Sequence, residues 1–121
     1  DGTLAPGAKV GSQANAPDAE ILDLAFRLAC DAGNLEIVKI LVEAGARLAS
    51  ADLMGFTGLH RAAWNADPAI VRYLLDRGAP VAAKQAYGGT PLATLKWALE
   101  NDAKTPRPHA AEVIAMLEAA Q

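Results

Sequence analysis

The chain contains few of the residues from which catalytic and metal sites are built. Its 121 residues include one cysteine and two histidines, and the histidines, His60 and His109, lie 49 positions apart. No HExxH, CxxC, GxSxG or phosphate-loop pattern occurs in the sequence. We therefore expect no enzymatic activity, no cofactor and no bound metal.

The chain also lacks an excess of positive charge and a long apolar run. Its 11 Lys and Arg residues are outnumbered by 14 Asp and Glu residues, which gives a net charge of −3. This balance argues against nucleic acid or an anionic membrane as the partner, because both attract basic surfaces. No apolar run approaches the roughly 20 residues that a membrane-spanning helix needs, so we expect no membrane segment.

The single cysteine, Cys30, has no partner for an internal disulfide. A lone thiol favours a reducing compartment, so we expect a cytoplasmic protein. The chain begins at Asp1 rather than Met, and export after removal of a leader, or excision from a longer protein, stays open. Cys30 lies on an apolar stripe and is expected to be buried and inert.

What the chain does contain is a repeating pattern. Gly45-Ala46 recurs 33 positions later as Gly78-Ala79. Two further sets share this offset: Gly55, Thr57, Leu59 and Trp64 recur as Gly88, Thr90, Leu92 and Trp97, and Ile37, Val38 and Leu41 recur as Ile70, Val71 and Leu74. A fixed period of this length is typical of proteins built from stacked repeats.

Within each repeat the apolar residues follow the spacing of two short helices. The stripes have i, i+3, i+4 spacing, as in Leu59, Ala62 and Ala63. Gly45 and Gly78 follow the second helices at positions where a left-handed residue is favoured, and they are predicted to end those helices. The 28 alanines suit closely spaced helices with a thin core.

Part of the second repeat resembles an ankyrin repeat. Segment 52–63 reads DLMGFTGLHRAA, against the ankyrin pattern DxxGxTPLHxAA, and segment 70–79 reads IVRYLLDRGA, against IVxxLLxxGA. The resemblance covers about residues 19–121 and implies an all-α solenoid of three helix-turn-helix repeats joined by hairpin-like loops. It also implies that His60 bonds to the threonine and the turn backbone. Gly58 departs from the pattern, which has proline at that position.

The expected organisation is an extended N-terminal tail at 1–17 and one ankyrin repeat domain at 18–121. The repeats are placed at about 19–51, 52–84 and 85–121. The last repeat contains an insertion near 100–110, because the pattern of its second helix resumes at Val113, 10 positions late. We interpret this polar, proline-containing segment as an extended first helix and a projecting loop, and favour a tolerated insertion over a binding loop.

The resemblance also implies where a partner binds. In ankyrin repeats, the end of the first helix and the tip of the hairpin form a concave face that grips other proteins. Carried onto this chain, that face comprises Leu53, Met54, Phe56, Trp64, Asn65, Lys84, Tyr87 and Trp97, together with Asp31, Ala32 and Ala98. Large exposed apolar patches usually mark contacts, so we interpret these as partner-binding residues. The alternative is that each tryptophan only seals its repeat.

The sequence thus predicts a non-catalytic module that binds a protein or peptide through a concave aromatic face. Two alternatives stay open. One is a regulatory or docking domain excised from a larger enzyme. The other is a self-associating module, in which the chain's own N-terminal tail, or that of a second copy, occupies the face. The sequence does not identify the partner, because binding residues in such repeats vary independently of the scaffold.

Overall fold

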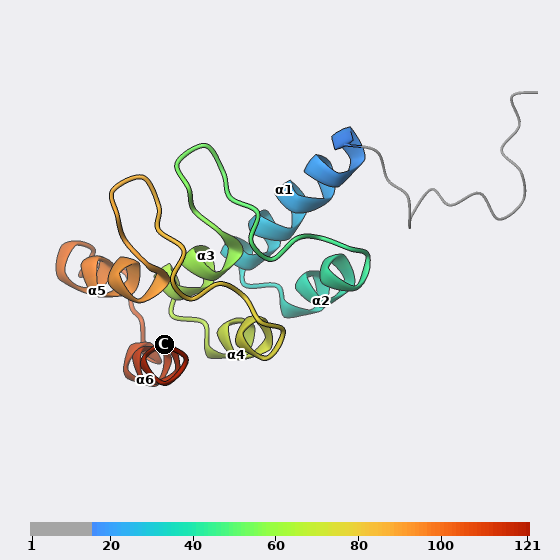
Figure 1. The fold of residues 1–121 in the computed structure, drawn as a ribbon. Coiled ribbons are helices and arrows are strands. Elements are labelled where there is room, and N and C mark those ends of the chain that lie inside the picture. The colour runs from blue at the N-terminus through green and yellow to red at the C-terminus, as the bar shows by residue number, and fades with distance from the viewer. Residues whose placement is uncertain (1–15) are drawn as a thin grey trace, which may run out of the picture.

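The computed structural model describes residues 16–121, which fold into three pairs of helices (Figure 1). The helices are α1 (Ala16–Ala32), α2 (Leu35–Glu43), α3 (Gly58–Trp64), α4 (Pro68–Asp76), α5 (Pro91–Asn101) and α6 (Ala110–Ala119). Within this range there is no β-strand, only an isolated bridge between Ala51 and Thr57. The predicted all-α helical repeat fold is confirmed. The predicted tail at 1–17 lies outside the described residues, except that positions 16 and 17 begin α1.

The helices form two layers. Helices α1, α3 and α5 lie side by side in one layer, and α2, α4 and α6 lie in the other (Figure 1). The loops that lead into α3 and α5 extend from the same edge of the stack. We call residues 51–57 the first hairpin loop and residues 84–90 the second hairpin loop.

The core lies between the two layers. Its largest fully buried side chains include Phe26 on α1, Leu59 on α3, Leu74 on α4 and Leu95 on α5. Burying a side chain of this size contributes about 1.5–3 kcal/mol to folding. The core is thin, as expected, because many of the other buried residues are alanines.

The first helix pair has no neighbour on one side within the described range. Ile37 on α2 is therefore 40% exposed, whereas Ile70, the equivalent residue 33 positions later, is fully buried. Leu24 and Leu28 on α1 are exposed as well. This pattern follows from the stacked architecture, in which each repeat buries its apolar surface against the next.

Glycines end α2 and α4, as the sequence predicted. Gly45 and Gly78 have φ angles of +110° and +83°. Each glycine N–H, and the N–H that follows it, donates to a carbonyl of the last helical turn, which is the Schellman arrangement. Ala66 takes the same place after α3 with a φ of +52°. Its left-handed backbone is unfavourable for alanine, but its methyl group is buried.

The insertion in the third repeat differs from the prediction in one respect. The extended first helix is present, since α5 has 11 residues and α3 has 7. The segment after it does not project freely, because Arg107 folds back and its side chain is only 2% exposed. Its Nε donates to the carbonyl of Trp64 at 2.7 Å. The last carbonyls of a helix have no partner within the helix and carry partial negative charge, so a guanidinium is well suited to bind there.

Gly58 is explained by the side chain that faces it. A Cβ atom at this position would lie 2.7 and 2.8 Å from two ring carbons of Phe26 and 3.0 Å from Sγ of Cys30. Phe26 is fully buried, so its ring has little room to move. The proline of the ankyrin pattern therefore does not fit here. Pro91 fits in the next repeat, where the residue equivalent to Phe26 is the smaller Leu59.

Replacing Gly58 with the proline of the pattern is therefore expected to destabilise the protein. Proline is otherwise favourable at the first position of a helix, but overpacking against Phe26 should lower the free energy of unfolding by about 1–3 kcal/mol. Urea denaturation of Gly58→Pro measures the loss.

The matched control is the double variant Gly58→Pro/Phe26→Leu. A smaller side chain at position 26 makes room for the proline, so the two losses should be less than additive. Full additivity would show that Phe26 is not what excludes proline from this position.

Candidate functional site

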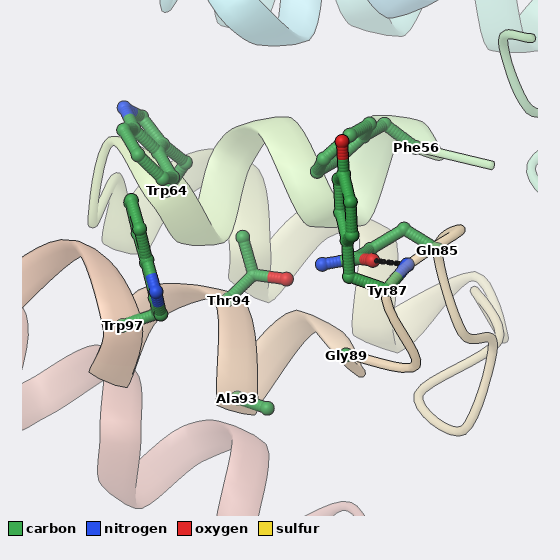
Figure 2. Close-up of a pocket in the computed structure, with 8 residues that line it drawn as sticks. All are labelled: Phe56, Trp64, Gln85, Tyr87, Gly89, Ala93, Thr94 and Trp97. Atoms are coloured by element: carbon green, nitrogen blue, oxygen red, sulfur yellow. Dashed lines mark hydrogen bonds between the residues drawn. The ribbon is translucent and has the colours of Figure 1, made fainter. Parts of the chain in front are cut away.

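A pocket of about 640 Å³ lies between the two hairpin loops and the helices that follow them (Figure 2). It is lined by Phe56, Trp64, Gln85, Tyr87, Gly89, Ala93, Thr94 and Trp97. None of these side chains is charged. Its size lies within the range of about 300–1,000 Å³ that is typical of ligand pockets.

Two tryptophans form one wall of the pocket. The ring centroids of Trp64 and Trp97 lie 5.8 Å apart, with 30° between the ring planes. They come from the same position of consecutive repeats, so stacking the repeats places them next to each other (Figure 2). Trp97 is 55% exposed, whereas Trp64 is half-buried.

Two of the four aromatic rings of the pocket are each covered by the guanidinium of a different arginine. Arg107 lies 5.4 Å from the ring centroid of Trp64, and Arg61 lies 4.8 Å from that of Phe56. Each guanidinium is held by a carboxylate, because Arg107 pairs with Asp102 and Arg61 pairs with Asp52. Contacts of this kind stabilise the orientation of the rings.

Asp52 organises the first hairpin loop. Its Oδ1 accepts hydrogen bonds from the backbone N–H groups of Met54 and Phe56, at 2.9 and 3.0 Å. Its Oδ2 accepts a bond from Arg61 at 2.8 Å. Burial raises the pKa of this carboxyl, but the bonds from Phe56, Arg61 and Met54 together outweigh it, so the pKa lies below its usual value. The loop, and with it the Phe56 ring, is therefore held by a charged carboxylate.

His60 connects the second repeat to the third. Its Nε2 lies 2.9 Å from the carbonyl of Gly89, and its Nδ1 lies 2.9 Å from Oγ1 and 3.2 Å from the backbone nitrogen of Thr57. A carbonyl can only accept, so Nε2 carries the hydrogen and Nδ1 accepts both bonds from Thr57. The imidazole is fully buried and neutral in this arrangement, and it helps to position one residue of the pocket, Gly89.

Comparison with known proteins identifies the fold family. Residues 8–85, more than half of the chain, match the family model of ankyrin repeats in three copies. The chain belongs to the ankyrin repeat family. The resemblance inferred from segments 52–63 and 70–79 is thereby confirmed.

Curated relatives of this ankyrin chain share only part of its length. It is 49% identical over 47 residues to protein phosphatase 1 regulatory subunit 27 of Homo sapiens, and likewise to that of Mus musculus. The matched stretch covers 39% of this chain and 30% of each relative. The chain thus matches less than a third of the relatives' length.

The pocket brings together four of the eight binding residues proposed for this ankyrin chain, namely Phe56, Trp64, Tyr87 and Trp97. The other four do not line it. Leu53 and Met54 are exposed on the first hairpin loop, and Lys84 is exposed on the second. Asn65 donates from Nδ2 to the carbonyl of Asp31, so it connects the ends of α3 and α1.

The prediction that Ala98 belongs to the concave face is wrong. Ala98 is fully buried, so it cannot meet a partner. Successive residues of a helix are rotated by about 100°, and this step turns Ala98 from the open side, where Trp97 lies, into the core. Asp31 and Ala32 are exposed, as predicted.

Sequence reasoning missed four residues that line the pocket: Gln85, Gly89, Ala93 and Thr94. Gln85 could have been found from the period, because it lies 33 positions after Asp52. The two residues act alike in the structure, since Oε1 of Gln85 accepts a hydrogen bond from Tyr87 N and Oδ1 of Asp52 accepts one from Met54 N. Thr94 carried no such signal, since its equivalent is Arg61. Arg107 was missed as well, because it belongs to the insertion that was predicted to project.

The described residues of this ankyrin domain offer no reactive thiol and no metal-binding cluster. Cys30 is buried, and burial, together with Asp67 and Asp31, raises the pKa of its thiol to about 12. The thiol is therefore protonated and a poor nucleophile at neutral pH. Among residues 16–121 no three His, Cys, Asp or Glu side chains gather in a way that could hold a metal ion. No helix in that same range is both long enough and apolar enough to cross a membrane.

The pKa of His60 is lowered from its usual value of 6.5. Burial is the largest cause, and the positive charge of Arg61 lowers it further, while the bond to Gly89 and the charge of Asp52 act in the opposite direction. The unfolded chain therefore binds a proton on this residue more readily than the folded chain. Stability from this group is complete above pH 6.5 and is lost as the pH falls below that value.

We therefore expect the free energy of unfolding to fall below pH 6.5, by up to about 1.4 kcal/mol per pH unit. Urea denaturation at a series of pH values between 7.5 and 5 measures this slope. His60→Gln should be less stable at neutral pH but should lose most of the slope. His109→Gln is the matched control, because His109 is exposed, and it should keep the slope. A slope unchanged in His60→Gln would assign the acid sensitivity to another group.

Proposed function

We propose that this ankyrin domain is a non-catalytic binding module that seats an apolar segment of a partner protein in the pocket. The observation that carries the proposal is the gathering of Phe56, Trp64, Tyr87 and Trp97 around one opening. The chain has two Phe, two Trp and two Tyr residues in all, so most of its aromatic side chains are there. Ankyrin repeats are protein-interaction modules, and the relative named a regulatory subunit agrees with a non-enzymatic role.

The exposure of the aromatic side chains supports binding rather than sealing. Tyr87 is 81% exposed and Trp97 is 55% exposed, although both line the pocket. A side chain that only seals a repeat would be covered by that repeat. Covering this apolar surface with a partner would contribute favourable free energy at about 25 cal/mol per Å². Tryptophan and tyrosine are also enriched among the residues that dominate binding energy in protein interfaces.

Trp97→Ala should therefore weaken partner binding and leave stability almost unchanged. As an interface hot spot, Trp97 should contribute about 2 kcal/mol of binding free energy, close to a 30-fold change in Kd. Affinity capture would first identify the partner, and calorimetry with the purified partner would then give Kd, alongside thermal melting of each variant.

The matched control is Ile40→Ala, because Ile40 on α2 is 58% exposed, much as Trp97 is, but lies outside both the pocket and the predicted concave face. It should change neither Kd nor Tm. Trp64→Ala should lower both affinity and Tm, because Trp64 is half-buried and lies beneath Arg107. If Trp97→Ala instead lowered Tm strongly and left Kd unchanged, the tryptophans would be sealing the repeats and the assignment of the site would be wrong.

A second candidate function follows from the relatives. Their name describes a regulatory subunit of protein phosphatase 1, and the identity of 49% over 47 residues makes a phosphatase a candidate partner here too. In that case this ankyrin domain would act on a separate enzyme, which differs from the first alternative drawn from the sequence, a regulatory or docking domain excised from a larger enzyme. We expect the purified catalytic subunit of protein phosphatase 1 to bind the wild-type chain and to bind Trp97→Ala more weakly. No binding of the catalytic subunit in calorimetry would remove this candidate and leave the pocket proposal standing.

The other alternative was self-association through the N-terminal tail. The tail lies outside the described residues up to position 15, so this alternative stays a prediction. Light scattering of the chain with and without residues 1–17 distinguishes it from binding to a separate protein.

A further inference from the structure

One polar atom in the pocket is left without a hydrogen bond. Thr94 is only 4% exposed, and its Oγ1 has no partner among the described residues. The side chain stands between the tryptophan pair and the Phe56–Tyr87 side of the pocket (Figure 2). A buried hydroxyl without a partner costs about 1–3 kcal/mol, so a group that enters the pocket and bonds to Oγ1 would recover that free energy.

A second polar atom lies at the same corner of the pocket. A Cβ atom built on Gly89 would lie 3.4 Å from Thr94 Oγ1 and 2.7 Å from Gln85 Nε2, so both polar atoms lie close to the backbone of Gly89. The Oε1 atom of Gln85 is held by the backbone N–H of Tyr87, and this leaves Nε2 on the side that faces Thr94 (Figure 2). The corner thus offers an amide donor and a hydroxyl, which can donate or accept.

The rest of the lining restricts the chemistry of the occupant. Four aromatic rings suit a flat apolar group, which they can contact in stacked or edge-on geometry. No charged side chain lines the pocket, so a charged group would lose its hydration without gaining a counter-charge. A purely apolar group would leave Thr94 Oγ1 without a partner. The occupant is therefore expected to have an aromatic body and a neutral polar tip.

We propose that the pocket binds the side chain of a tyrosine in the partner segment. This inference rests on the proposed function, and it names the group that the same site recognises. The phenol O–H donates to Thr94 Oγ1, and the phenol oxygen accepts from Gln85 Nε2, so both polar atoms gain a partner. An indole N–H fits less well, because it donates but cannot accept from Gln85.

The test compares p-cresol, the side-chain analogue of tyrosine, with toluene, the analogue of phenylalanine. Toluene is the more apolar of the two, so a pocket without a hydrogen-bonding corner would bind toluene more tightly. We expect the opposite order, with p-cresol at least about fivefold tighter, since one hydrogen bond has a net value near 1 kcal/mol. Titrations of the ¹⁵N-labelled chain, followed by NMR at the indole N–H groups and at Gly89, give both Kd values and locate the site.

The decisive variant is Thr94→Val, which keeps the shape of the side chain and removes the hydroxyl. Because it also removes a buried unpaired group, it should fold with a Tm no lower than that of the wild type. We expect its preference for p-cresol over toluene to fall by at least about fivefold, because only the bond from Gln85 Nε2 is left. Thr94→Ser, the matched control, keeps a hydroxyl and should keep the preference for p-cresol. An unchanged preference in Thr94→Val would overturn the proposal.

A third arm uses the blocked peptide Ac-Ala-Tyr-Ala-NH₂ and its phenylalanine counterpart. Tighter binding of the tyrosine peptide at the same resonances supports a partner segment as the source of the phenol. Binding of p-cresol with no binding of the peptide would overturn the peptide source. If toluene binds in the pocket as tightly as p-cresol, the tyrosine inference fails and the apolar docking function stands. If no probe shifts the pocket resonances, both fail.

Discussion

The candidate binding face depends on the hydrogen bonds that the neutral imidazole of His60 makes through both of its ring nitrogens. The imidazole is fully buried, and it joins Thr57 at the start of α3 to the carbonyl of Gly89 at the end of the second hairpin loop. One side chain therefore affects both how a helix begins and where the loop of the next repeat lies. A protonated imidazole would lose this arrangement, because its Nδ1 could no longer accept the bonds from Thr57.

The core and the pocket are formed by largely different faces of the same helices. Leu59 on α3 and Leu95 on α5 face the core, whereas Trp64 and Trp97 on the same two helices line the pocket. The insertion contacts the side of α3 that lines the pocket. Arg107 closes the C-terminal end of α3 through the carbonyl of Trp64, and it also lies over the ring of that residue. A segment with no counterpart in the other repeats thus supports the pocket wall.

Much of the scaffold and part of the site were predictable from periodicity. The 33-residue offset placed the helices and the glycines that end them, and the ankyrin resemblance brought Phe56, Trp64, Tyr87 and Trp97 to one face. Ala98 was misplaced because adjacent positions at the end of a helix point in very different directions, and only packing decides which one is buried.

The sequence by itself determined the fold family, the glycines that end α2 and α4 and the position of most of the aromatic residues, because these depend on local pattern and on a period that repeats. Only the tertiary structure decided that Phe26 excludes proline at position 58, that Arg107 folds back onto α3, and that the Thr94 hydroxyl is buried without a partner. Each of these depends on contacts between segments far apart in the chain or on the surroundings of one side chain. Such features have no period from which they could be inferred.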